Sequence, residues 1–101
     1  MFDKAEEEFK KEIKINPLYE LGYYNLGRLY AQEKRFSEAE EYWLKAIELK
    51  PDYIQAHQDL AVYYFQSKSY EKCLYHINEI VKYGGPLHPE LVKLKKILES
   101  Q

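Results

Sequence analysis

A 34-residue period constrains the fold of this chain more than any other feature. Shifted by 34 positions, the sequence overlays itself without a gap, and most aligned positions carry apolar or aromatic residues. The aligned sets are Phe2, Phe36 and Tyr70; Ala5, Ala39 and Cys73; Phe9, Trp43 and Ile77; Ile13, Ile47 and Val81; Tyr23, His57 and Leu91; Leu26, Leu60 and Leu94; and Tyr30, Tyr64 and Leu98. A period of this length is typical of repeat proteins, in which each copy packs against its neighbours.

Within each copy the apolar residues have the spacing of α-helices. Between Tyr23 and Tyr30, apolar or small residues stand at i, i+3, i+4 and i+7, which is one face of a helix. Prolines at positions 17 and 51, and the Gly-Gly-Pro run at 84–86, mark helix ends. The sequence therefore predicts an all-α fold of six antiparallel helices, at about residues 3–15, 20–33, 37–49, 53–66, 70–83 and 88–99.

The composition argues against several classes of protein. Lys+Arg number 15 and Asp+Glu number 17, and the net charge of −2 disfavours nucleic-acid binding, which needs a basic face. One cysteine, Cys73, excludes an internal disulfide framework. No apolar run approaches the roughly 20 residues of a membrane-spanning helix, and the first residues are too charged for a signal peptide. We therefore expect no nucleic acid, no membrane insertion and, by default, a cytoplasmic location.

The ordered motif residues resemble the tetratricopeptide repeat family. Its pattern is W-x2-L-G-x2-Y, then A-x3-F, then P. The sequence has Tyr23-x2-Leu26-Gly27-x2-Tyr30, followed by Ala39-x3-Trp43 and Pro51, so that the differences are exchanges of one aromatic residue for another. A second, weaker copy runs through His57-x2-Leu60-Ala61-x2-Tyr64 and Cys73-x3-Ile77.

The resemblance implies an all-α, right-handed superhelix of helical hairpins over residues 1–101. Residues 1–19 would be the second half of a truncated repeat, 20–53 and 54–87 two full repeats, and 88–101 a C-terminal capping helix. Lys95 occupies the small-residue position of Gly27 and Ala61, which suits a last helix that faces water. Because the first helix lacks the partner that should precede it, we expect the chain to be a fragment of a longer protein.

No residue set predicts an enzyme, a metal site or a cofactor. His57 fills an aromatic packing position, and a buried imidazole is the usual occupant of such a position. His76 and His88 share no carboxylate at the spacing that a metal site needs. Cys73 replaces alanine in the repeat, which predicts a small buried thiol rather than a nucleophile.

The predicted site is the concave side, which the resemblance assigns to the first helix of each pair and which typically holds a protein or peptide segment. The expected partner-binding residues combine exposed apolar, amide and charged side chains, and flank packing between helices is the other interpretation of some of them. They are Leu21, Tyr24, Asn25, Arg28, Gln32, Gln55, Gln58, Asp59, Val62, Phe65, Gln66, Lys93 and Lys96. Asn25 matches a position where family members carry a peptide-binding asparagine. Arg28 and the two lysines suggest an acidic or C-terminal segment.

Self-association is the alternative function. The unpaired first helix would then pack against another copy of the chain, with Phe2 and Phe9 at the contact. A homo-oligomer is therefore the second kind of assembly that the sequence predicts.

Overall fold

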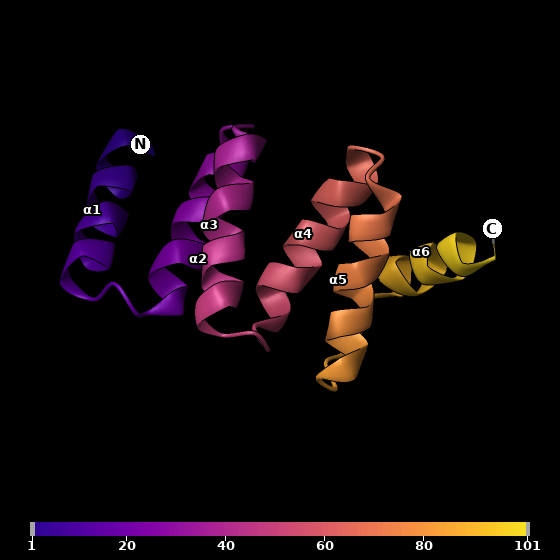
Figure 1. Ribbon diagram of the computed structural model, residues 1–101. Helices are drawn as coiled ribbons and strands as arrows, with labels where there is room; N and C mark the ends of the chain where they lie inside the picture. Colours follow the sequence, from indigo (N-terminus) through magenta and orange to yellow (C-terminus); the bar gives the residue numbers. More distant parts are fainter. Residues whose placement is uncertain (1, 101) are drawn as a thin grey trace. The chain divides into compact units, whose positions relative to one another are not determined.

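The computed structural model describes residues 2–100, except for the side chain of Phe2. These residues form helices and turns without a β-strand, as the periodicity predicts. The six helices, shown in Figure 1, are α1 Phe2–Ile15, α2 Glu20–Gln32, α3 Phe36–Leu49, α4 Ile54–Gln66, α5 Tyr70–Lys82 and α6 Pro89–Glu99. Each end lies within one residue of its predicted position, and the prediction of an all-α fold is confirmed.

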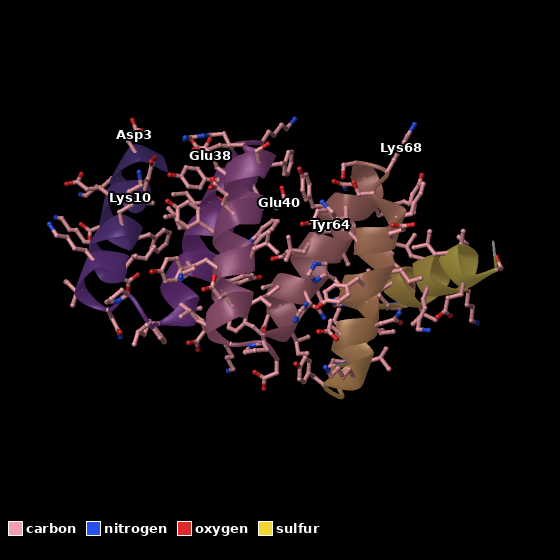
Figure 2. All side chains as sticks on the ribbon, viewed as in Figure 1. Asp3, Lys10, Glu38, Glu40, Tyr64 and Lys68 are labelled. Atoms are coloured by element: carbon pink, nitrogen blue, oxygen red, sulfur yellow. The ribbon has the colours of Figure 1, made fainter. Side chains whose placement is uncertain are left out.

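Two turns repeat the same backbone conformation 34 residues apart. Lys34 and Lys68 have positive φ angles of 62° and 64°, and each follows a helix that ends two residues earlier. The next amide closes the turn in both copies, since Arg35 N–H donates to Tyr30 C=O at 2.8 Å and Ser69 N–H donates to Tyr64 C=O at 2.7 Å. Figure 2 shows Lys68 projecting from the turn between α4 and α5. These turns join each helix to its antiparallel neighbour.

The chain divides into two compact units, residues 1–56 and 57–101. In the first unit, α2 and α3 pack through fully buried Leu26, Ala39 and Ala46, with Trp43 only 4% exposed. Gly27 allows the close approach, because a Cβ on this residue would lie 2.5 Å from Cδ1 of Trp43. Position 27 therefore needs a residue without a Cβ, because the indole of Trp43 packs directly against the backbone of α2.

Hydrogen bonds from two tyrosines of α2 attach α1 and the turn that follows it. The hydroxyl of Tyr23 donates to Pro17 C=O at 2.9 Å. The hydroxyl of Tyr30 donates to Oε1 of Glu6 at the same distance. Arg35 lies over the Tyr30 ring, 4.4 Å from its centroid, and 3.9 Å from Oε2 of Glu6. Lys10, labelled in Figure 2, pairs with Glu6 and, together with Tyr30, lowers the pKa of that carboxyl.

The second unit has its own core, formed by α5, α6 and most of α4. Its fully buried residues include Leu60, Ala61, Ile77 and Ile80, and Leu91 of α6 is 1% exposed. The imidazoles of His57 and His76 are also buried here. Lys95, in the small-residue position of α6, instead pairs with Glu99 at 2.6 Å, as expected for a side chain that reaches water.

Candidate protein-binding site

The first unit carries a shallow hollow between α1 and α2. This N-terminal hollow has a volume of about 250 Å³ and is lined by Ala5, Phe9, Asn25, Arg28, Leu29 and Gln32. Its floor is apolar, because Leu29 is buried and Phe9 is half-buried. The amides of Asn25 and Gln32 and the exposed guanidinium of Arg28 supply donors, and the amides also supply acceptors. A peptide backbone could pair with these groups.

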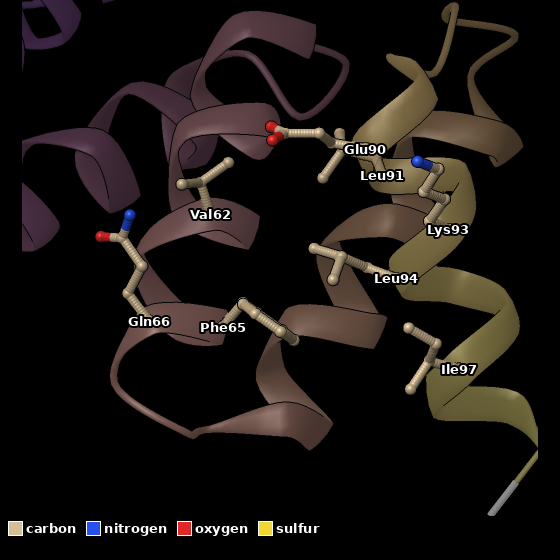
Figure 3. Close-up of a pocket in the computed structure, with 8 residues that line it drawn as sticks. All are labelled: Val62, Phe65, Gln66, Glu90, Leu91, Lys93, Leu94 and Ile97. Carbon is tan, nitrogen blue, oxygen red and sulfur yellow. The ribbon is translucent and has the colours of Figure 1, made fainter.

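The second unit carries a larger hollow between α4 and α6. This C-terminal hollow has a volume of about 420 Å³ and is lined by Val62, Phe65, Gln66, Glu90, Leu91, Lys93, Leu94 and Ile97. Figure 3 shows Phe65 of α4 facing Leu94 of α6, with Glu90 and Lys93 toward one end. Ile97 is 52% and Val62 39% exposed, so apolar surface remains in contact with water. An apolar side chain of a partner could bury this surface.

Seven of the thirteen predicted site residues line one of the two hollows. Three belong to the N-terminal hollow and four to the C-terminal hollow: Asn25, Arg28 and Gln32, and Val62, Phe65, Gln66 and Lys93. The other six line neither hollow: Leu21, Tyr24, Gln55, Gln58, Asp59 and Lys96.

Tyr24 does not have the exposure that the sequence analysis expected. Its side chain is only 9% exposed, because its ring packs edge-on against Tyr53 with the centroids 5.1 Å apart. Arg28 lies over the same ring, 6.0 Å from its centroid. Tyr24 is therefore a support for the cation of the N-terminal hollow, and its ring offers little surface to a partner.

Gln58 is engaged within its own unit. Its Nε2 donates to Pro86 C=O at 3.5 Å, which connects α4 to the segment before α6. Gln55 and Lys96 are exposed, and Asp59 and Leu21 are half-buried. Partner binding by these residues remains a prediction, and it would require a partner that extends beyond the hollow.

The sequence analysis missed half of each hollow's lining. Ala5 and Phe9 come from α1, which the resemblance assigns to a truncated repeat, and Leu29 is a buried residue of α2. On α6, Glu90, Leu94 and Ile97 follow one another at helical spacing and share one face. That spacing is the signal that could have placed them beside Lys93.

Cys73 and two of the three histidines are buried, whereas His88 is exposed. The Cys73 thiol is fully buried, and burial raises its pKa, which disfavours the nucleophilic thiolate. His57 and His76 lie side by side with their Nδ1 atoms 2.9 Å apart, a pairing that the sequence analysis did not predict. Among residues 2–100, no group of three or more His, Cys, Asp or Glu side chains has the geometry of a metal site.

Comparison with known proteins assigns the repeat. The family model described as tetratricopeptide repeat matches residues 21–53. These residues are a tetratricopeptide repeat. Tetratricopeptide repeats are protein-interaction modules, and the match indicates this broad class for residues 21–53. A search of curated proteins gives no match.

A solved structure shows that the described residues have the fold of a tetratricopeptide repeat domain. The structure described as the TPR2B domain–pHsp70 complex of yeast Sti1 is 24% identical to the chain, with a TM-score of 0.82. The match covers 99% of this chain and 84% of that one. At this identity the likeness establishes the fold and leaves the ligand open. Within the part of the chain that the structure describes, no helix is long and apolar enough to span a membrane.

Proposed function

We propose that each of the two hollows holds an extended peptide segment of a partner protein. The observation that carries the proposal is the chemistry of their linings, since each combines an apolar floor with amide and cationic side chains. Apolar floors favour burial of partner side chains, whereas amides can pair with a peptide backbone. The solved structure with the same fold was determined as a complex with pHsp70, which is consistent with a protein partner.

We further propose that the bound segment carries a carboxylate, either acidic or C-terminal. Arg28 of the N-terminal hollow is exposed and is held over the Tyr24 ring. Lys93 of the C-terminal hollow is also exposed. Glu90 lies toward the same end of this lining, so a negative group must approach Lys93 from the side away from that carboxylate. A segment with one carboxylate beside an apolar residue fits this arrangement.

A peptide-array screen followed by calorimetry tests the proposal. Arg28→Ala is expected to weaken a peptide found by the screen about tenfold, a typical loss for one charge-assisted hydrogen bond. Lys4→Ala is the matched control, because Lys4 is an exposed cation of α1 that lines neither hollow. Equal affinity of Arg28→Ala and the unmodified protein for every peptide found would exclude this hollow as the site.

The C-terminal hollow has its own matched pair of variants. Val62→Ser removes apolar surface from the lining, whereas Val81→Ser makes the same change on α5 outside it. The two valines are 39% and 49% exposed, so neither change disturbs a fully buried position. We expect a loss of affinity of about fivefold for Val62→Ser and none for Val81→Ser. Equal effects of both changes would show that the hollow does not bind the peptide.

Self-association is a second candidate, favoured by exposed apolar side chains at the end of α1. Ile15 is 83% and Leu18 75% exposed, more than any other large apolar residues of the described chain. Phe9 is half-buried and lines the N-terminal hollow, and the side chain of Phe2 lies outside the described residues. Sedimentation of the unmodified protein and of Leu18→Asp tests this candidate. A concentration-dependent dimer that the substitution removes would support it, and a monomer at high concentration would exclude it.

A further inference from the structure

A pair of histidines is buried in the second unit. Nδ1 of His57 on α4 lies 2.9 Å from Nδ1 of His76 on α5, and the two residues are 1% and 5% exposed. A hydrogen bond between two Nδ1 atoms requires a proton on one and a lone pair on the other. At least one imidazole is therefore neutral and carries its own proton on Nε2. A further proton on that ring would place two N–H groups face to face and add a positive charge to the interior.

The first repeat shows what these positions hold without a histidine pair. Tyr23 and Tyr42 stand 34 residues before His57 and His76, and their rings stack with centroids 6.4 Å apart. A neighbouring pair of stacked rings has the same spacing in both units. The ring centroids of Tyr30 and Tyr42 are 5.5 Å apart, and so are those of Tyr64 and His76. The equivalent positions of the two hairpins thus carry two tyrosines in the first unit and two histidines in the second.

We propose that the His57–His76 pair makes the second unit a proton-sensitive element, in which acidification favours opening of the unit, because the separated imidazoles take up protons that the buried hydrogen-bonded pair excludes. The first unit lacks such a pair at the equivalent positions and keeps its stability over the same range. The proposal concerns stability alone and does not depend on the proposed peptide site.

The rings of three tyrosines pack against the pair. His76 contacts the rings of Tyr64 and Tyr75, and His57 contacts the ring of Tyr83. The ammonium of Lys72 lies over the Tyr64 ring, and that of Lys82 lies over the Tyr83 ring. The hydroxyl of Tyr75 donates a hydrogen bond to the carboxylate of Glu79. On α4, Asp59 stands two positions beyond His57. On α6, the buried residue is Leu91, while Glu90 and Lys93 line the C-terminal hollow and Lys95 pairs with Glu99.

The direction of the pH effect follows from this burial. Desolvation, and secondly the charge of His57, lowers the pKa of His76 from 6.5 to about 4. A lowered pKa means that the unfolded state takes up a proton that the folded state refuses. The contribution to stability is therefore fully present above pH 6.5 and is lost progressively as the pH falls to about 4.

Hydrogen exchange at pH 7 and pH 5, corrected for the intrinsic exchange rates, tests the proposal on the whole chain. Between these pH values the opening equilibrium of α4 and α5 in the second unit should rise about 20-fold, as the two pKa values require, while that of α2 and α3 changes less than about twofold. The matched control is the double variant His57→Tyr/His76→Tyr, which installs the tyrosines of the first repeat and should abolish the difference. The same pH response in both proteins, or none in the unmodified protein, would overturn the proposal.

A second measurement needs no variant and therefore does not depend on how the double variant folds. Long-range ¹H–¹⁵N spectra report the protonation of each imidazole nitrogen in the folded protein. We expect one ring of the pair to keep an unprotonated Nδ1 at pH 5. Two fully protonated imidazolium rings at pH 6 in the folded protein would overturn the proposal.

Discussion

At the scale of single residues, the small position of the repeat depends on the ring that faces it. Gly27 stands where the next copy has Ala61, and Trp43 stands where that copy has Ile77. A Cβ on Gly27 would meet Cδ1 of Trp43 at 2.5 Å, Nε1 at 2.6 Å and the carbonyl oxygen of Ala39 at 3.2 Å. Trp43 is larger than Ile77, and Gly27 opposite it is smaller than Ala61. The two differences in side-chain volume therefore compensate each other within one repeat.

Gly27→Ala should therefore destabilise the protein although alanine favours helices. Alanine gains about 1 kcal/mol in helix propensity, but overpacking against a ring that is 4% exposed costs up to about 3 kcal/mol. We expect a net loss of about 1 to 2 kcal/mol in the free energy of unfolding, measured by urea denaturation.

The control for this prediction is Gly22→Ala. The new Cβ would meet only Cγ1 of Ile13 within 4 Å, at 3.3 Å, and Ile13 is half-buried and able to shift. This variant should be neutral or slightly more stable. If the two alanine variants have equal stability, the indole does not determine the residue at position 27.

At the scale of elements, the turns after α2 and α4 contain a backbone conformation that suits glycine. Lys34 and Lys68 have positive φ, a region that costs a residue with a Cβ about 1 kcal/mol or more. After α5 the corresponding turn has Gly84 at φ 74°, and Gly85 N–H donates to Ile80 C=O at 2.9 Å. The same backbone hydrogen bond closes all three turns, but only the turn after α5 has glycine at the position with positive φ.

Lys68→Gly should accordingly stabilise the second unit. Relief of the left-handed conformation outweighs the added freedom of the unfolded chain, and we expect a gain of about 0.5 to 1 kcal/mol in thermal or urea unfolding. Lys72→Gly is the comparison, because Lys72 lies inside α5 and glycine there should lose about 1 kcal/mol. A loss of stability in Lys68→Gly would mean that the lysine side chain stabilises the turn more than its φ angle strains it.

At the scale of the whole molecule, the chain has two cores rather than one. Trp43 belongs to the core of the first unit, and Leu91 to that of the second. In repeat proteins, stability is close to a sum over units and nearest-neighbour terms. One cooperative transition is therefore not required, although the chain is only 101 residues long.

Leu91→Ala tests this division of the core. Removing most of a side chain that is 1% exposed should cost the second unit about 2 to 4 kcal/mol. Hydrogen-exchange protection should fall mainly in α5 and α6, whereas Trp43 fluorescence, which reports the first unit, should keep a denaturation midpoint closer to that of the unmodified protein. An equal loss in both units would show that the chain unfolds as a single cooperative body.

The 34-residue period predicted the helices well because helix formation depends on neighbours along the chain. Spacing of apolar residues, prolines and glycines acts within a few residues, and each helix end was placed within one residue. Asn25, Arg28 and Val62, which the sequence analysis expects on the partner-binding side, line the hollows, and their role in binding stays a prediction. Burial of Cys73 also followed from its alignment with Ala39, which is likewise fully buried.

The sequence by itself thus determined the helices, their repeat register and the broad class of the protein, since these follow from periodic burial and from local backbone preferences. Only the tertiary structure decided that Tyr24 is covered by Tyr53 and that His57 meets His76. It also decided that α1 and α6 complete the two hollows. These features depend on which side chains of different helices meet. The period along the sequence shows which face of a helix a residue occupies, but not which atoms of another helix lie opposite it.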